Sequence, residues 1–564
     1  MKSSFSSRIP ENSYTKKYRE PFAEFAEEYR KKPIESIPYS VFRLYRDTGS
    51  RVEYEALYFD LRRRVDVFAV MVLSGKKEYL PDLEDALCAV LEQYTWALPA
   101  HLAKVKSAEE EVTKIDLFAA ETAQMLSELL FLLREELSEE IGGRIKYEVR
   151  RRILTPYREK RTKWAKSNWS AVCAFGVLSA FYYLADAAET EEVLPDLCES
   201  LEVFLSSYCD DGCCSEGPLY WSYGFGTFVS AAAMLREFTD GRINYFKEEK
   251  VRKIAEYGFC LYLKDNMTVP FADAPHRMNF NVGLYHFLKK EYPELPLPDA
   301  NFAENFGDEE RFRFFQMIRD LYWFDETLPA ARTFPERVDF PESQVFIRHR
   351  KELHLACKGG HNAEVHNHND VGSFVLISGD EYILDDPGWP EYDKGYSQKE
   401  SRYRDYLCAR SDGHSLPIFG GEGQKFGAEY AARLLKNEDD EIVLDLSGAY
   451  GLKEGSIERA FLLTDHSFVL RDRFSEELAG NAGEKKIIDR LVTRATPKRG
   501  EENTLLIGDC VLSFPAGVTL KIKTETFTPR SVCRIGMKPV ETLFLIDVEV
   551  PGNEMIWSVQ KRGK

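Results

Sequence analysis

Three histidines fall within one short stretch of the chain, GGHNAEVHNHNDVGSF, at His361, His366 and His368. His366 and His368 are two residues apart, so on an extended strand their side chains would lie side by side on one face. Imidazole nitrogen is a preferred ligand of zinc, but a zinc site usually takes three or four protein ligands. The pair therefore predicts a metal site only if other parts of the chain supply further ligands.

Two later turns offer such ligands. Asp386 lies in the turn ILDDPG, and His414 lies in SDGHSLP. Asp385 is a rival for the first position, and the sequence does not decide which of the two carboxylates points inward. Histidines that are satisfied by hydrogen bonds without a metal are the structural alternative for an isolated HxH pair. The Asn, Asp and Gly residues around the pair favour a functional turn.

A second cluster, SSYCDDGCCSEGPLYWSYGFGTF, combines glycines with aromatic rings and hydroxyl groups. The glycines break helical continuity, while Tyr220, Trp221 and Tyr223 supply the rings. This composition is typical of a loop at the mouth of a helical barrel, where binding residues gather. A packed aromatic turn is the alternative.

A third feature is Asn168, which is followed by Trp169 at the start of the helical stretch NWSAVCAFG. Asparagine is a favourable N-cap, so a capping role alone would explain its presence.

The N-terminal part of the chain is helical in pattern. From about residue 20 to about residue 325 apolar residues recur at helical spacing, as in IDLFAAETAQMLSELLFLLREEL and NWSAVCAFGVLSAFYYLADAAE. We expect roughly ten to twelve helices, with Thr113 and Asp116 as a capping box before the first of these stretches. Successive helical hairpins of this size predict an α/α toroid, that is, an incomplete barrel, with a helical solenoid as the alternative.

The C-terminal part is β in pattern. A Pro-rich, irregular stretch between about residues 290 and 345 marks the domain joint. Beyond it, short runs bounded by Gly, Asp and Asn predict the strands of an antiparallel β-sandwich: VFIRH, LHLACKG, SFVLIS, EYILDDPG, EIVLDLSG, RAFLLTD, SFVLRDRF, TLKIKTETF and TLFLIDVEV. The predicted architecture is α+β and multidomain, with the toroid over residues 1–330 and the sandwich over residues 331–564.

The net charge of −18 argues against a nucleic-acid or anionic-membrane binder, because such proteins display a broad basic face. An anionic ligand would need a locally basic cleft. The basic segment from Arg144 to Lys166 is one candidate, with a solvated helix face as the alternative.

The N-terminal stretch MKSSFSSRIPENSYTKKY has no apolar signal segment, and no run reaches the roughly 18 apolar residues of a membrane span, so we expect a cytoplasmic protein. Eleven scattered cysteines fit free thiols. Cys209, Cys213 and Cys214 lack the paired C-x-x-C spacing of a zinc site. The sequence leaves the oligomeric state open, a homo-oligomer included.

The stretches GGHNAEVHNHNDVGSF, ILDDPG and EGPLYWSYG together resemble the heparinase II/III-like superfamily of polysaccharide lyases, which also includes oligoalginate lyases. The resemblance implies an α/α toroid followed by an antiparallel β-sandwich, with the active site in the cleft between them. It also implies β-elimination at a uronic acid, in which a base removes the C5 proton next to the carboxylate and the bond to the C4 oxygen breaks. Such a site needs donors facing the carboxylate, a base and an acid.

The resemblance implies a role for each matching residue. Asn168 would neutralise the substrate carboxylate, Tyr220 would be the catalytic tyrosine, and His366 would face the substrate. The resemblance also implies a zinc ion with His368, Asp386 and His414 as its ligands. We expect this ion to be structural, and we expect no organic cofactor. The residues expected to bind substrate around them are Trp169, Glu216, Tyr223 and His361.

One position departs from the superfamily pattern. Several relatives have histidine directly after the asparagine, where this chain has Trp169. The departure puts more weight on Tyr220 and His366, with Tyr223 as the alternative tyrosine. Without that histidine we expect syn elimination, with Tyr220 as both base and acid.

The favoured substrates are anionic oligosaccharides that contain uronic acid, of the glycosaminoglycan type. Two other functions stay open. A glycoside hydrolase on the same toroid would need paired carboxylates across the cleft, for which Asp210, Asp211 and Glu216 are available. The second alternative is a carbohydrate-binding protein without catalytic activity, and Trp169, in the place of the superfamily's histidine, is the feature that supports it.

Overall fold

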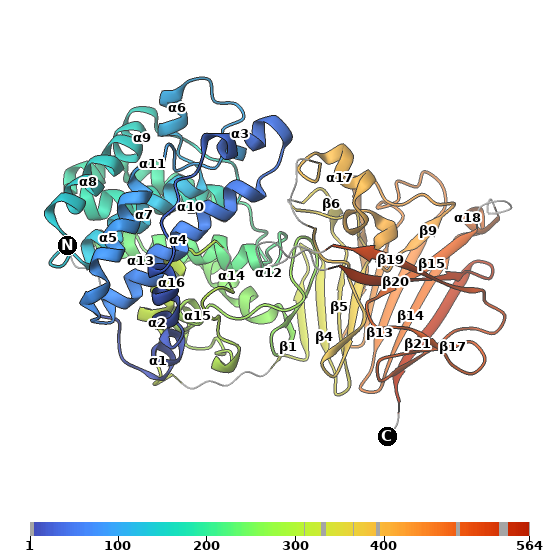
Figure 1. Cartoon of the computed structure of the whole chain (residues 1–564). Coiled ribbons are helices and arrows are strands. Elements are labelled where there is room, and N and C mark those ends of the chain that lie inside the picture. The colour runs from blue at the N-terminus through green and yellow to red at the C-terminus, as the bar shows by residue number, and fades with distance from the viewer. Residues whose placement is uncertain are drawn as a thin grey trace.

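The computed structural model describes residues 5–308, 311–328, 334–364, 366–390, 395–480, 486–528 and 540–562. Helices dominate the N-terminal half, drawn in blue to green in Figure 1, and sheets dominate the C-terminal half, drawn in yellow to red. The last helix of the first half, α16, is Phe314–Trp323, and the first strand of the second half, β3, is Arg337–Phe340. The predicted boundary between residues 330 and 331 lies outside the described residues.

The N-terminal domain is an α/α toroid. Its longer helices before α16 are α2 (Phe22–Arg30), α3 (Tyr39–Thr48), α4 (Val52–Leu73), α5 (Leu80–Leu91), α7 (Leu117–Leu132), α8 (Glu139–Val149), α10 (Asn168–Leu184), α11 (Ala187–Leu205), α13 (Gly226–Phe238), α14 (Glu249–Cys260) and α15 (Val282–Glu291). Its shorter helical segments are α1 (Ser13–Arg19), η1 (Lys77–Tyr79), η2 (Pro99–His101), α6 (Ala108–Thr113), η3 (Arg150–Leu154), α9 (Thr155–Lys160), α12 (Pro218–Tyr220), η4 (Trp221–Phe225), η5 (Tyr245–Lys247) and η6 (Ala300–Phe302). The described helices exceed the expected ten to twelve because short segments such as α6 and α12 stand apart from the long ones.

The two most apolar helical stretches of the sequence form the centre of this domain. Helix α10 packs against α7, α11 and α13 and is buried along almost its whole length. A helix that is apolar on all sides is stable only where neighbours cover it on all sides. The helical pattern of both stretches is therefore confirmed.

Two expected helix caps are shifted in the structure. Asp116 alone caps α7, accepting a hydrogen bond from the N–H of Ala119 at 2.7 Å, because Thr113 belongs to the end of the preceding helix α6. The N-cap of α10 is Ser167, so Asn168 is the first helical residue. The side chain of Asn168 is therefore not used for capping.

The C-terminal domain is built from antiparallel sheets. An eight-stranded sheet has the order β11-β12-β13-β14-β21-β18-β17-β16, and a four-stranded sheet has the order β19-β20-β15-β9. A five-stranded sheet, β3-β4-β5-β7-β8, lies nearest the helices in Figure 1. The bounds of the strands after β3 are β4 (Val345–His349), β5 (Leu353–Lys358), β6 (His361–Asn362), β7 (Phe374–Ser378), β8 (Glu381–Leu384), β9 (Pro417–Phe419), β10 (Gly427–Ala431), β11 (Arg433–Asn437), β12 (Glu441–Asp445), β13 (Ile457–Leu463), β14 (Ser467–Phe474), β15 (Ile487–Thr493), β16 (Lys498–Arg499), β17 (Thr504–Ile507), β18 (Cys510–Ser513), β19 (Leu520–Phe527), β20 (Glu541–Glu549) and β21 (Glu554–Lys561). The predicted strands and the sandwich are confirmed.

The five-stranded sheet joins the two domains because both of its faces are buried. Along β7, Val375 and Ile377 pack into the core of the helical domain, while Phe374 and Leu376 pack into the core of the sandwich. Successive side chains of a strand point to opposite faces, so a strand that is covered twice must be apolar at every position. This explains the unbroken apolar run SFVLIS, and it fixes the preceding histidine loop at the junction of the domains.

The histidine loop is not a strand. It connects β6 to β7, and His366 has a left-handed backbone with φ of 58°. The two rings consequently face different neighbours: His366 stacks on Tyr220 with ring centroids 4.2 Å apart, whereas the centroid of His368 lies 5.4 Å from that of His414. The expectation that His366 and His368 lie on an extended strand is therefore wrong.

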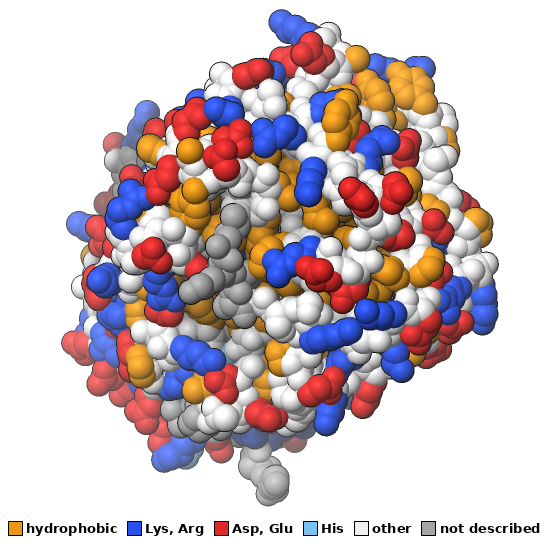
Figure 2. Space-filling view, turned by 90° about the vertical axis from the view of Figure 1, so that its left-hand side faces the viewer, with side chains coloured by type: hydrophobic (Ala, Val, Ile, Leu, Met, Phe, Trp, Pro, Cys, Tyr) orange, Lys and Arg blue, Asp and Glu red, His pale blue; other side chains and the backbone are white. Residues whose placement is uncertain are grey.

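The basic segment around α8 and α9 is a solvated helix face. Arg158 lies 2.8 Å from Glu189, and Lys163 lies 3.2 Å from Asp196. Figure 2 shows basic and acidic side chains interspersed over this side of the molecule. Arg150 and Arg161 likewise pair with acids of α11, and Arg144, Arg151 and Arg152 pair with Glu148 of α8 itself. The segment is therefore not a basic cleft.

Candidate active site

A cavity of about 610 Å³ lies between the toroid and the sandwich. Its toroid wall comes from segments spread between Arg51 and Gln316, and its sandwich wall is formed by His366, Trp389, Tyr396, Ser397 and Arg402. Five of the residues expected at the site line this cavity: Asn168, Trp169, Tyr220, Tyr223 and His366. The tertiary structure therefore brings together residues from three separated stretches of the sequence.

Asn168 presents its amide to the cavity. The residue is 7 % exposed, and its side chain forms no hydrogen bond with the described residues. Behind it lies Gly224, where an added Cβ would be 3.1 Å from the Cβ of Asn168. The absence of a side chain at Gly224 lets η4 pack closely against the start of α10 and holds Asn168 in place.

Tyr220 and His366 form a stacked pair across the domain junction. The phenol oxygen of Tyr220 lies 3.4 Å from Nδ1 of His366, and the two ring planes are 22° apart. Tyr220 comes from α12 at the Gly217–Pro218 turn, where Gly217 has φ of 96° and proline opens the helix. The turn explains why the EGPLY stretch ends with a phenol at the cavity.

Tyr223 is held differently. Its hydroxyl donates a hydrogen bond of 2.6 Å to Glu121, and the guanidinium of Arg313 lies 3.7 Å from its ring centroid. Burial and the Glu121 carboxylate raise the pKa of Tyr223 well above the usual value. The phenol of Tyr223 is thus stabilised in its neutral form, which favours Tyr220 as the reactive tyrosine.

The residue that the sequence interpretation missed is Asp273, from the loop between β2 (Met267–Thr268) and α15. This fully buried carboxylate accepts hydrogen bonds from Nδ1 of His366 at 2.7 Å and from Nε2 of His368 at 3.2 Å. It also accepts from Tyr396 at 2.5 Å and lies 3.3 Å from Arg402. Burial by itself would raise the pKa of Asp273, but the hydrogen bonds from the two histidines and the charge of Arg402 hold it well below its usual value.

No local signal pointed to Asp273, because it lies 93 residues before His366. The one available hint was a lone acid inside the apolar stretch VPFADAP, since an isolated carboxylate among apolar residues needs a partner. Its position means that one toroid residue orients both histidines of the sandwich loop.

Two expected substrate-binding residues lie away from the cavity lining. Glu216 is 9 % exposed and lies behind His366, with 3.6 Å between its Oε2 and the Nε2 of the imidazole, and burial raises its pKa. His361 does not line the cavity and lies 3.2 Å from Glu364. Trp169 lines the cavity and contacts the ring of His101.

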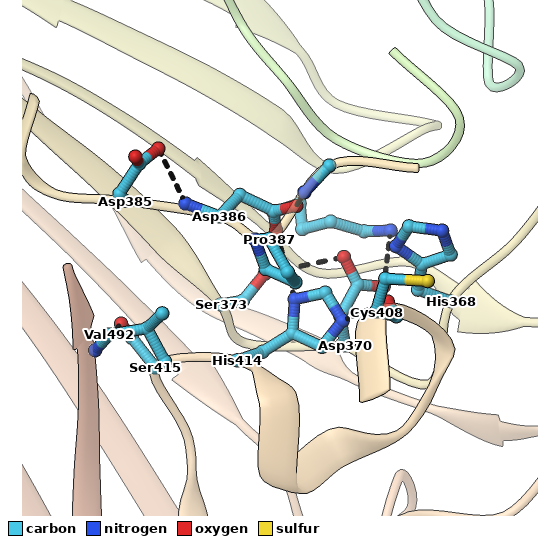
Figure 3. A network of polar contacts seen from close by, with 12 residues as sticks. His368, Asp370, Ser373, Asp385, Asp386, Pro387, Cys408, His414, Ser415 and Val492 are labelled. Carbon is cyan, nitrogen blue, oxygen red and sulfur yellow. Dashed lines mark hydrogen bonds and ion pairs between the residues drawn. The ribbon is translucent and has the colours of Figure 1, made fainter. Parts of the chain in front are cut away.

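The expected metal ligands form one buried cluster. Ligand atoms of His368, Asp386 and His414 all lie within 4.8 Å of one another. Nδ1 of His414 is 2.9 Å from Asp386, and its Nε2 donates to the main-chain oxygen of Cys408 at 2.8 Å. Burial opposes a charge on His414, but the Asp386 carboxylate raises its pKa, while burial lowers the pKa of His368. Figure 3 shows the three residues converging beside the Cys408 turn.

The cluster fits a zinc ion. Nδ1 of His368 is buried without a hydrogen-bond partner, while Nε2 of the same ring is bonded to Asp273. A carboxylate behind the ring fixes the proton on one nitrogen and leaves the other as a metal ligand. Two imidazoles and one carboxylate form a ligand set that zinc accepts.

Asp385 points away from this cluster, as Figure 3 shows. It lies 2.7 Å from Arg494 and 2.8 Å from His276, which comes from the toroid. Arg494 and His276 lower the pKa of Asp385 to about 2 against the effect of burial. Of the two rival carboxylates, Asp386 is the one beside His368 and His414, and Asp385 joins the domains.

The cavity is more basic than the chain as a whole. Its lining includes Arg51, Arg277, Arg311, Arg313 and Arg402, against the carboxylates of Glu304 and Asp308. On a chain of net charge −18, this local excess of cations is suited to an anionic ligand.

The carboxylates that a hydrolase would need are arranged differently. Asp210 lies 3.1 Å from Lys250, and Asp211 accepts main-chain N–H groups of residues 342 and 343 at 3.0 and 2.9 Å. Neither lines the cavity. Of the three acids considered from the sequence, only Glu216 lies beside the site.

The two-domain fold of this chain is similar to that of solved polysaccharide lyases. Heparinase III is similar, with a TM-score of 0.67, 12 % identity, and coverage of 100 % of this chain and 87 % of the other. Heparan sulfate lyase HepC from Pedobacter heparinus has a TM-score of 0.61 at 13 % identity, covering 100 % and 85 % of the two chains. Chondroitin AC lyase from Streptomyces coelicolor A3 has a TM-score of 0.55 at 11 % identity, covering 100 % and 81 %.

The expected resemblance to these lyases is confirmed at the level of the fold. No protein-family model matches the chain. No curated protein sequence matches it either. Among the described helices, none is long and apolar enough to cross a membrane.

Proposed function

We propose that the protein is a lyase that cleaves uronic-acid-containing oligosaccharides, of the glycosaminoglycan type, by β-elimination. The observation that carries this proposal is the convergence of Asn168, Tyr220 and His366 on one cavity whose lining is rich in arginine. The shared fold with heparinase III and chondroitin AC lyase supports it.

Asn168 supplies the amide that binds the uronate carboxylate and reduces its charge, which makes the C5 proton more acidic. Its side chain has the required freedom because no described residue occupies its hydrogen-bonding groups. His366, oriented through Nδ1 by Asp273, faces the same carboxylate region.

Tyr220 returns a proton to the C4 oxygen when the C4–O bond breaks. In the syn form of the reaction expected from the sequence, it also takes the C5 proton. The electrons of the C5–H bond then form the C4=C5 double bond, and the product is an unsaturated uronate and a free hydroxyl group. Each proton transfer of this kind contributes about 10²- to 10⁴-fold.

A zinc ion held by His368, Asp386 and His414 would be structural, because the cluster lies beside the cavity and none of its three ligands lines it. Such an ion would fix the loop that carries His366. The protein groups, not the ion, perform the proton transfers.

The test is ultraviolet absorbance of purified protein incubated with heparan sulfate, chondroitin sulfate, hyaluronan and alginate oligosaccharides. The conjugated double bond of a lyase product absorbs, whereas a hydrolase product does not. We expect a rise with at least one substrate, and its loss in Tyr220→Phe, whose ring still stacks on His366. Reducing-end release without this absorbance would establish a hydrolase instead.

A further inference from the structure

A second histidine opens onto the cavity from an element that the sequence interpretation did not consider. His101 ends η2, and its side chain is 16 % exposed and lines the cavity. Its ring lies between Phe118, at a centroid distance of 6.0 Å, and the edge of Trp169, at 4.8 Å. The imidazole is therefore packed in a fixed orientation on the wall that begins with Asn168.

A buried carboxylate holds this imidazole from behind. Nδ1 of His101 lies 2.6 Å from Oδ2 of Asp116, which is fully buried. Asp116 is itself anchored, because it caps α7 through Ala119 and accepts the N–H of Leu98 at 3.1 Å. The carboxylate places the proton of the neutral ring on Nδ1 and leaves the lone pair on Nε2. Nε2 forms no hydrogen bond with the described residues, so it presents this lone pair to the cavity.

The position of His101 suits the group that takes the C5 proton. C5 is bonded directly to the carboxylate that Asn168 binds in the proposed function, so the base must lie close to Asn168. Trp169 follows Asn168 in α10 and contacts His101, which places the imidazole on the same wall. A carboxylate-oriented imidazole is an effective base near neutral pH, whereas an ordinary phenol, with a pKa of about 10, is mostly protonated.

We propose that the His101–Asp116 dyad is the general base of the reaction, an inference that rests on the proposed function. Nε2 of His101 takes the C5 proton, the C5–H electrons form the C4=C5 bond, and the C4–O bond breaks. Tyr220 gives its phenolic proton to the departing oxygen. Proton exchange with water then returns the imidazolium and the phenolate to their starting states. The two transfers that the syn form assigns to Tyr220 are thus divided between two residues.

The key variant is His101→Asn, because its amide still offers an N–H to Asp116 but has no counterpart of Nε2. We expect kcat on the best substrate of the oligosaccharide panel to fall about 10²- to 10⁴-fold, with KM within about threefold of the wild type and an unchanged melting temperature. In His101→Ala, added imidazole should restore activity in a saturable manner, because the truncated side chain leaves room beside Asp116. A merely structural histidine would show no such rescue.

Two results overturn the inference and are distinguishable. If His101→Asn keeps kcat within about threefold of the wild type while Tyr220→Phe abolishes product, the dyad is structural and the proposed lyase function stands. If the wild type forms no unsaturated product from any oligosaccharide of the panel, the proposed function is refuted, and the role of the dyad as a general base is refuted with it.

Discussion

Replacement of Asp273 by asparagine tests how the two domains build one site. The change keeps the shape of the side chain but removes its charge and turns one oxygen into a donor. In the wild type, both carboxylate oxygens accept hydrogen bonds. The donors are His366, His368, Tyr396 and Arg402. At least one donor would then face another donor in a site without exposed surface.

The expected loss of stability follows from these contacts. Removing one partner of a fully buried ion pair costs about 3–5 kcal/mol, because the remaining charge stays buried without compensation. Asp273 is fully buried and the side chain of Arg402 is 13 % exposed, so we expect a loss near the lower end of this range. The orientation of His366 is lost as well, and the removal of an orienting carboxylate behind a catalytic imidazole lowers kcat by up to about 10⁴-fold. We therefore expect Asp273→Asn to lower both the free energy of unfolding and kcat.

Denaturant unfolding and initial rates of absorbance increase measure the two effects. The matched control is Asp472→Asn in the sandwich core, where Asp472 pairs with Arg459 at 2.6 Å and both side chains are fully buried. The control should lose similar stability and keep its kcat, since it does not line the cavity. If Asp273→Asn unfolds as easily as the control and retains kcat within about threefold of the wild type, Asp273 only joins the domains and the orienting role is refuted.

Three further predictions follow from other parts of the structure. Zn²⁺ at about 100 times its dissociation constant should stabilise chelator-treated protein against unfolding by about 2.7 kcal/mol. The substitution His414→Ala should abolish this stabilisation. Equal stabilisation of the variant and the wild type in thermal unfolding would contradict the assigned ligands. His286 is buried, which lowers its pKa to about 4, and its Nδ1 accepts a main-chain N–H at 2.9 Å. In the unfolded state the imidazole has its usual pKa of about 6.5, so it binds a proton between pH 6.5 and 4 while the folded state does not. The contribution of His286 to the free energy of unfolding should therefore be fully present above pH 6.5 and fall by up to about 3 kcal/mol as the pH drops to 4. Denaturant titrations of His286→Asn should show a shallower fall, and an identical pH profile would refute this. Gly224→Ala should displace Asn168 and lower kcat/KM by about tenfold or more, whereas Gly143→Ala, in open space on α8, should match the wild type in the same assay.

The sequence by itself determined the elements and much of the site. Helical spacing and short β-type runs are local patterns, so they predicted α7, α10 and the strands of the sandwich. The HxH pair and the turns ILDDPG and SDGHSLP marked candidate ligands, with Asp385 and Asp386 as rivals, and the structure clusters His368, Asp386 and His414. These signals survive in sequence because each depends on residue type and short-range spacing.

Only the tertiary structure decided how these parts meet. The two histidine rings lie against different rings, Tyr220 and His414, and Asp273 bonds both histidines from a loop of the other domain. Likewise, the ring contact between His101 and Trp169 joins segments far apart in the chain. Such contacts depend on how covered sheets and helices pack, and packing has no periodic signature in one sequence. The site forms where loops of the five-stranded sheet, which is buried on both faces, lie against the toroid. This arrangement exists only in the folded chain.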